Sequence, residues 1–168
     1  MVLITSFIFA SLIFFLILAM FTGAPLVPSK PPTVERMLKL LNLKKGQILY
    51  DLGSGDGKIL ITAAKQGAQG IGIEINPYAV LLSWVLAILA GVVKSVHFEW
   101  GNYWQHSLSA ADAVVVYAMP QFMPRLAVKL QKELKKGTRI VSNTFTIPQL
   151  KLVKQERVGF DKVYLYEI

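Results

Sequence analysis

Three glycines and two acids stand close together in one short stretch of the chain, YDLGSGDGKI at positions 50–59. The glycines are Gly53, Gly55 and Gly57, and the acids are Asp51 and Asp56. Glycine lets the backbone approach a ligand closely, because it has no Cβ in the way. Backbone N–H groups in such a loop bind anionic groups, whereas the two carboxylates attract positive charge. The stretch therefore predicts a loop that binds a ligand with positive centres.

Two common phosphate-binding loops do not match this stretch. A dinucleotide-binding loop needs Gly-x-Gly-x-x-Gly, and its last glycine would fall at Lys58. A P-loop ends in Gly-Lys followed by a hydroxyl residue, and this chain has Ile59 in that place. S-adenosylmethionine fits better, because its ammonium and sulfonium suit the acids and its carboxylate suits the loop N–H groups. A tight strand-to-helix turn without a ligand remains the alternative.

A third acid, Glu74, comes near the end of the next apolar run, GIGIEIN at positions 70–76. In nucleotide-binding folds, an acid at the end of the second strand accepts hydrogen bonds from a ribose diol. The acidic glycine loop and Glu74 therefore favour S-adenosyl-L-methionine as the cofactor. The chain has no cysteine and two histidines, so we expect no metal site.

These residues need a scaffold, and strand and helix patterns alternate along the chain. Five apolar runs predict strands, at 47–53, 70–76, 95–102, 112–119 and 138–145. Segments between them predict helices, at 57–67, 77–92 and 123–137. The last segment, 150–168, predicts two antiparallel strands. The expected fold class is α/β, with a Rossmann-like, mostly parallel sheet and an antiparallel closing hairpin. We interpret the very apolar 77–92 segment as a buried crossover helix rather than a second membrane span.

The first 23 residues contain no charged side chain, and the first charge in the sequence is Lys30. About 20 apolar residues in a helix reach roughly 30 Å, the thickness of a bilayer core. We therefore expect one N-terminal transmembrane helix as an anchor (1–23), a proline-rich linker (24–32) and a globular domain (33–168). A cleaved signal peptide and a buried hairpin or oligomer helix are the alternatives.

Basic residues follow the apolar segment, and none precedes it. Because positive charge stays on the cytoplasmic side, we expect a single-pass membrane protein whose domain faces the cytoplasm. The chain has a net charge of +8, with a basic cluster near the end of the 123–137 helix: Lys129, Lys132, Lys135, Lys136 and Arg139. These cations complement the helix dipole. They can also bind anionic lipid, which we favour over nucleic acid as a partner.

The stretch DLGSGDGK followed by GIEINP resembles the motifs of class I S-adenosylmethionine-dependent methyltransferases. Further segments are similar to the ATP synthase c-subunit lysine methyltransferase family and its prokaryotic relatives: PLVPS, VERML, YAMPQFMPRLAVKLQKEL and SNTFTIP. That family is membrane-associated and methylates protein lysine. The resemblance implies that residues 33–168 form a methyltransferase domain that methylates a lysine of a membrane-associated protein, near the bilayer.

The resemblance also implies, position by position, which residues hold the cofactor. The methionine part would contact the loop residues Asp51, Gly53, Ser54, Gly55 and Gly57. Glu74 would bind the ribose hydroxyls, and Ile75 would pack on the adenine. Asn102 stands where many such enzymes have an acid that binds the adenine amino group, and its side-chain carbonyl can accept that hydrogen bond. Tyr103 would close over the ring.

The methyl acceptor is expected at the ends of the fourth and fifth strands, because ligands bind at the carboxyl ends of parallel strands. An apolar pocket there would lower the pKa of a lysine ammonium, and its candidate residues are Tyr117, Met119, Pro120, Asn143 and Phe145. We expect Tyr117 and Asn143 to position the acceptor amine. Two alternatives stay open: methyl transfer to a lipid or small hydrophobic molecule, and a non-catalytic cofactor-binding module at a membrane.

Overall fold

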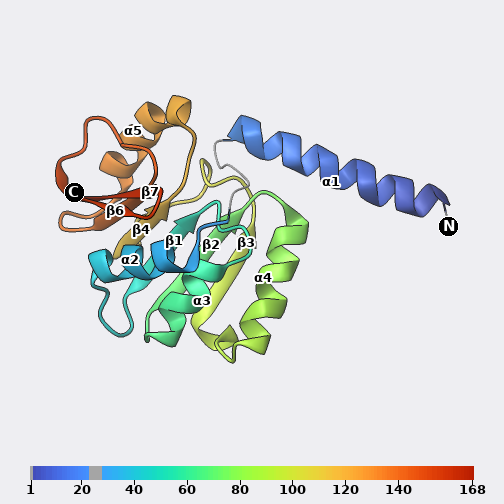
Figure 1. Ribbon diagram of the computed structural model, residues 1–168, viewed down its shortest axis with the longest axis horizontal. Coiled ribbons are helices and arrows are strands. Elements are labelled where there is room, and N and C mark those ends of the chain that lie inside the picture. Colours follow the sequence, from blue (N-terminus) through green and yellow to red (C-terminus); the bar gives the residue numbers. More distant parts are fainter. Residues whose placement is uncertain (1, 23–27) are drawn as a thin grey trace.

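The computed structural model describes residues 2–22 and 28–168, and its centre is a seven-stranded sheet with helices on both faces (Figure 1). The strands are β1 (Ile48–Leu52), β2 (Gln69–Glu74), β3 (Val96–Trp100), β4 (Ala113–Val116), β5 (Arg139–Asn143), β6 (Leu152–Val158) and β7 (Asp161–Glu167). The α-helices are α1 (Val2–Thr22), α2 (Pro31–Leu41), α3 (Lys58–Lys65), α4 (Pro77–Leu89) and α5 (Met123–Glu133). Short 3-10 helices precede β3 and α5, namely η1 (Val93–Ser95) and η2 (Pro120–Phe122).

The strand order in the sheet is β3-β2-β1-β4-β5-β7-β6. Strands β1 to β5 pair in parallel, and β7 is antiparallel to both β5 and β6. The predicted α/β class, the mostly parallel sheet and the antiparallel closing hairpin are therefore confirmed. The chain moves outward from β1 to β3 and then returns to β4, which lies on the other side of β1. Ligands bind at the carboxyl ends of the strands at such a reversal.

Each face of the sheet has its own hydrophobic core, because side chains along a strand alternate between the two faces. On one face the strands pack against α2, α3 and α4 (Figure 1), where Leu49 and Leu60 are fully buried. On the other face they pack against α5, where Leu126 and Leu130 are fully buried. The sheet is thus supported on both sides, and the loops at its carboxyl edge start from fixed positions.

The turn from β1 into α3 requires glycine at Gly57. This residue precedes α3 with a φ of 72°, in the left-handed region that a residue with a Cβ disfavours. A Cβ here would lie 2.6 Å from the ring of Phe98 on β3 and 3.0 Å from the Cβ of Ser83 on α4. Phe98 is itself buried and packs edge-on against Trp84. Gly57 therefore allows α3, α4 and β3 to pack closely beneath the glycine loop.

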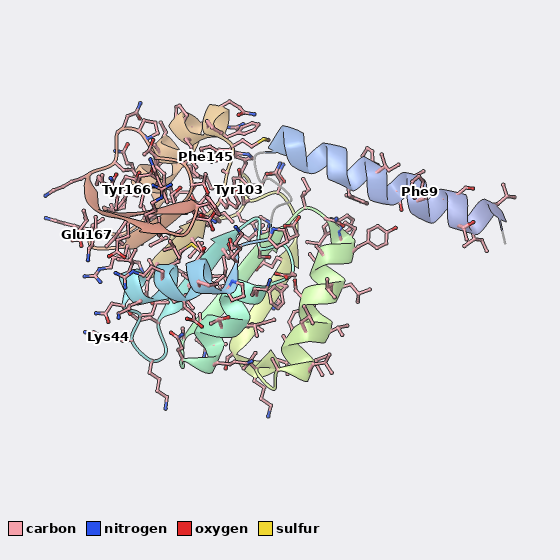
Figure 2. The ribbon with its side chains drawn as sticks, in the orientation of Figure 1. Phe9, Lys44, Tyr103, Phe145, Tyr166 and Glu167 are labelled. Carbon is pink, nitrogen blue, oxygen red and sulfur yellow. The ribbon has the colours of Figure 1, made fainter. Side chains whose placement is uncertain are left out.

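The N-terminal segment forms a single helix, α1, which extends away from the sheet (Figure 1). Its described apolar side chains include Leu3, Phe7 and Phe9, all of them more than half exposed, and Figure 2 labels Phe9. Within residues 2–22 and 28–168, no helix is both long enough and apolar enough to cross a membrane. The segment predicted as a helix is therefore helical, but its predicted role as a transmembrane span is not confirmed.

The crossover helix predicted at 77–92 is α4, but the prediction that it is buried is wrong. Its buried residues are Val80, Ser83 and Ala87, whereas its outer face exposes Leu81, Leu82, Val85, Ile88 and Leu89. The reason is its place in the fold: α4 packs beside β3, the edge strand. No further element in the described part of the chain covers the outer side of the helix. An apolar sequence pattern cannot by itself tell a covered helix from an uncovered one.

Candidate functional site

The candidate site lies at the carboxyl ends of β1, β2 and β3. A pocket there is lined by Gly53, Ile73, Glu74, Ile75, Gly101, Asn102 and Tyr103. The structure thus brings together five of the residues predicted to bind the cofactor, namely Gly53, Glu74, Ile75, Asn102 and Tyr103. Tyr103 and Phe145 are labelled at this edge of the sheet in Figure 2, whereas Lys44 precedes β1 at the opposite edge.

The carboxylate of Glu74 holds the glycine loop in place. Its Oε2 accepts a hydrogen bond from the N–H of Gly55 at 2.9 Å, and its Oε1 accepts one from the N–H of Asn76 at 2.9 Å. Glu74 is buried, so these bonds are shielded from water. Each carboxylate oxygen can accept a second hydrogen bond. Glu74 therefore retains acceptor capacity for the ribose hydroxyls that the sequence assigns to it.

The loop after β1 is tied to β2 through its backbone. The N–H groups of Gly53 and Ser54 both donate to the carbonyl of Ile73, at 2.9 and 3.3 Å. The Ser54 hydroxyl is buried and has no hydrogen-bond partner among the described residues. It lies 2.6 Å from the point that a Cβ of Gly72 would occupy. Its side chain thus packs against β2, and Ser54 is not among the residues that line the pocket.

Asp51 is a buried acid without a compensating cation. It is 3% exposed, and no basic side chain of residues 2–22 and 28–168 forms an ion pair with it. Burial, together with the negative charges of Glu74 and Asp56, raises the pKa of Asp51 to about 8. A cation beside Asp51 would lower that pKa again, because it stabilises the carboxylate. This environment fits the ammonium of S-adenosylmethionine.

Asn102 and Tyr103 form the wall of the pocket after β3. The Oδ1 of Asn102 accepts a hydrogen bond from the N–H of Trp104 at 3.1 Å, so the oxygen assigned to adenine already has one partner. Burial raises the pKa of Tyr103, and its ring packs against Trp104 with centroids 4.9 Å apart. The guanidinium of Arg125 lies 4.2 Å from the centroid of the Trp104 ring, within cation–π range. These contacts hold Tyr103 in the wall.

The predicted acceptor residues lie at the ends of β4 and β5, and none of them lines the cofactor pocket. The rings of Tyr117 and Phe145 are neighbours, with centroids 6.2 Å apart. Asn143 is buried, and its Nδ2 donates to the Oγ of Ser29 at 3.2 Å. Its Oδ1 accepts a hydrogen bond from the hydroxyl of Thr144, also at 3.2 Å. The amide of Asn143 is therefore held from both sides.

Gly101 and Ser29 are two residues of this region that the sequence analysis did not single out. Gly101 lines the pocket, and its N–H donates to the Glu74 carbonyl at 2.9 Å. A Cβ there would lie 2.5 Å from Nε2 of His106. The sequence did contain one signal for Gly101, namely its position directly before the predicted cofactor residue Asn102. Ser29 is far from Asn143 in the sequence, so no local pattern indicates their contact.

Among the described residues, no group of three or more His, Cys, Asp or Glu could hold a metal ion.

Comparison with protein families and curated proteins identifies relatives of this chain. The ANTKMT methyltransferase domain matches residues 51–154. The ATP synthase c-subunit lysine N-methyltransferase of Mus musculus is 36% identical over 144 residues, which cover 86% of this chain and 58% of that protein. A protein-lysine N-methyltransferase of Saccharolobus islandicus is 36% identical over 151 residues, which cover 86% of this chain and 93% of that protein. The chain thus spans about three fifths of the mouse relative and nearly all of the archaeal one.

A solved structure also resembles this chain over most of both lengths. It is the crystal structure of an RNA methyltransferase from Salinibacter ruber in complex with S-adenosyl-L-homocysteine. The two chains are 38% identical and superpose with a TM-score of 0.82, over 84% of this chain and 94% of the other. The similarity therefore extends from the motifs to the arrangement of the whole sheet.

The raised pKa of Asp51 makes the stability of the ligand-free protein depend on pH. Between the ordinary pKa of 3.8 and the folded value of about 8, the folded protein keeps a proton that the unfolded chain has released. The unfolded state then binds fewer protons, so the free energy of unfolding falls as pH rises through this range. Asp51→Asn has no such proton to lose, so its free energy of unfolding should depend less on pH over the same range. Chemical denaturation at several pH values between 5 and 8 measures both curves, and parallel curves would contradict the assigned pKa.

Proposed function

The chain belongs to the ANTKMT methyltransferase family, and we propose from this premise that it transfers a methyl group to a lysine side chain of a protein. Its cofactor is S-adenosyl-L-methionine, which supplies an electrophilic methyl group on a sulfonium. The observation that carries the cofactor assignment is the buried carboxyl group of Asp51, which has no compensating cation beside the glycine loop. Such a group ionises readily only beside a cation, so it favours a ligand with positive charge over a phosphate ligand.

The residues around the pocket have separate tasks in holding the cofactor. Asp51 attracts the ammonium, and the glycine loop brings its backbone close to the methionine part. Glu74 accepts hydrogen bonds from the ribose hydroxyls, and Ile75 packs on the adenine. Asn102 binds the edge of the adenine with the hydrogen-bonding capacity that its contact with Trp104 leaves free. The cofactor is thereby oriented at the carboxyl ends of β1 to β3.

The acceptor amine needs an environment that favours its neutral form, because an ammonium has no lone pair to attack a methyl group. Burial against apolar side chains lowers the pKa of a lysine, and the rings of Tyr117 and Phe145 supply such a surface. The Asn143 amide, held by Ser29 and Thr144, positions the amine. Rate enhancement in this arrangement comes mainly from holding the two reactants in line.

We also propose that the methylated protein is membrane-associated and that the N-terminal segment anchors this chain beside it as a single-pass membrane protein. Residues 1–29 carry no charged side chain, and basic residues follow them, which favours a domain on the cytoplasmic side. Protease added to the outer side of sealed cells should leave the domain intact. Cleavage of the domain from that side would contradict this orientation.

RNA is the second candidate acceptor, because the similar Salinibacter ruber structure is that of an RNA methyltransferase. The +8 net charge is compatible with either substrate. The protein acceptor is favoured because the relatives named for lysine methylation include proteins from animals and from an archaeon.

Incubation of the full chain with methyl-labelled S-adenosylmethionine and a cell extract tests the acceptor class. After separation into protein, RNA and lipid fractions, the label should be found in protein, and peptide mass spectrometry should place it on lysine. Label in RNA or lipid without labelled protein would contradict the proposal.

Asn143→Ala provides the matching test of the acceptor site. It should lower kcat by about 10- to 100-fold, because the acceptor loses its alignment, while the cofactor affinity stays unchanged. Asn42→Gly is a suitable control, since Asn42 ends α2 in the left-handed conformation that glycine adopts readily. Unchanged kcat in Asn143→Ala would exclude the positioning role of Asn143.

A further inference from the structure

The outer side of α4 is an apolar surface that is exposed to solvent. Five large side chains form it, here called the α4 face: Leu81, Leu82, Val85, Ile88 and Leu89. Their exposed fractions run from 45% to 78%. They recur at helical spacing, so they form one continuous stripe along the helix. Contiguous apolar patches on a protein surface commonly mark an interaction site.

The composition of α4 differs from that of a helix whose outer side faces water. No residue from Pro77 to Leu89 carries a charge. By contrast, α5 has Arg125, Lys129, Lys132 and Glu133 among its residues, and Val128 is its single large exposed hydrophobic residue. A helix that is hydrophobic all round is normally covered on both sides. The sheet covers the inner side of α4, so its outer side requires a second apolar partner.

The ends of the α4 face carry the side chains that mark a water–lipid boundary. Tyr78 and Trp100 lie at the amino end, where the Trp100 Nε1 donates to the carbonyl of Ile75 at 3.0 Å. Trp100 is 65% exposed, and Tyr78 is partly exposed. Lys94 follows the carboxyl end of the helix and is exposed. Tyrosine and tryptophan concentrate at the headgroup level of membranes, and lysine binds anionic headgroups.

The second apolar helix of the chain continues this surface. The hydroxyls of Ser11 on α1 and Tyr78 on α4 are hydrogen-bonded at 2.5 Å. The ring of Phe15 packs edge-on against Tyr78 with centroids 6.2 Å apart. Beyond this contact α1 extends away from the domain with exposed apolar side chains, among them Phe9 (Figures 1 and 2). The contact at Tyr78 therefore joins two apolar surfaces, one on α1 and the other on α4.

We propose that the α4 face docks onto a lipid bilayer and lies in its interfacial region, with α4 in the plane of the membrane. This surface contact is separate from any anchoring by the N-terminal segment and does not require a helix that crosses the bilayer. A bilayer explains the whole arrangement, because the leucines enter the acyl region while the aromatic residues and Lys94 remain at the headgroups. A second copy of the chain would cover the leucines but gives no role to the boundary residues.

The docked position has a consequence for the cofactor pocket. The α4 helix begins at Pro77, two residues after Ile75, which lines the pocket. Trp100 at the end of the α4 face directly precedes Gly101, which also lines it. Docking would therefore fix the distance and orientation of the pocket relative to the membrane surface. The pocket would then meet an acceptor lysine close to the bilayer in a single orientation of the domain.

A pair of single-cysteine variants tests the docking surface directly, because the chain contains no natural cysteine. Val85→Cys places a nitroxide label on the α4 face, and Val128→Cys places the same label on α5 as the matched control. The full chain is bound to vesicles of phosphatidylcholine and phosphatidylglycerol. The label at position 85 should then lose access to a water-soluble nickel complex and gain access to oxygen, whereas the label at position 128 should change little.

Two results of this experiment would overturn the proposal. In the first, the label at position 85 keeps its full access to nickel on vesicle-bound protein. In the second, it is already protected without vesicles and the protein has twice its monomer mass, so that a second copy covers the face.

A double variant adds a quantitative test that leaves the methyl-transfer site intact. On vesicle-bound protein, Leu81→Asn with Leu89→Asn should return the label at position 85 to nearly its full access to the nickel complex, because both substitutions weaken the burial of the α4 face in the bilayer. This readout does not depend on any anchoring by the N-terminal segment. Methyl transfer to a soluble acceptor peptide should be unchanged, because neither leucine lines the pocket. A label that stays as protected in the double variant as in Val85→Cys alone would overturn the docking proposal alone. If the protein without these substitutions does not transfer methyl groups, that result contradicts the proposed function and not the docking proposal.

Discussion

The hydrogen bonds made by Glu74 connect all parts of the candidate cofactor site. Its carboxylate accepts N–H groups from Gly55 in the glycine loop and from Asn76 at the start of α4. Its carbonyl accepts the N–H of Gly101 after β3. One buried residue at the end of β2 therefore fixes the segments that follow β1, β2 and β3. Asp51 lies close enough for the negative charge of Glu74 to raise its pKa. Glu74 therefore also favours the binding of a cation beside Asp51.

Much of this arrangement could be predicted from the sequence, because it depends on local signals. Glycines spaced between acids, an apolar run before them and Glu74 after the next run specify a strand, a loop and a second strand. The contact between Asn143 and Ser29 could not be predicted, since it joins residues from opposite ends of the chain. The exposed face of α4 was also missed. Its apolar pattern suggests burial, and its position beside the edge strand decides the outcome.

The site and the apolar surfaces meet at one edge of the sheet. The α4 helix starts from the Glu74–Asn76 turn and makes contact with α1 through Tyr78. Ser29, between α1 and α2, reaches Asn143 at the end of β5. The N-terminal region thus contacts both the start of α4 and the end of β5, where the acceptor residues are predicted. A membrane that holds α1 and the α4 face would set the position of the pocket and of the acceptor site together.

If the positive charge of the cofactor completes the buried site of Asp51, then the protons exchanged on binding test this most directly. Calorimetric titration with S-adenosylmethionine at pH 7, in two buffers of different ionisation enthalpy, counts those protons. With a pKa of about 8, Asp51 is mostly protonated before binding and should ionise beside the ammonium. The parent protein should therefore release about one proton, and Asp51→Asn should release none and bind much more weakly. Tight binding without proton release by the parent protein, or equally tight binding by Asp51→Asn, would contradict this role of Asp51.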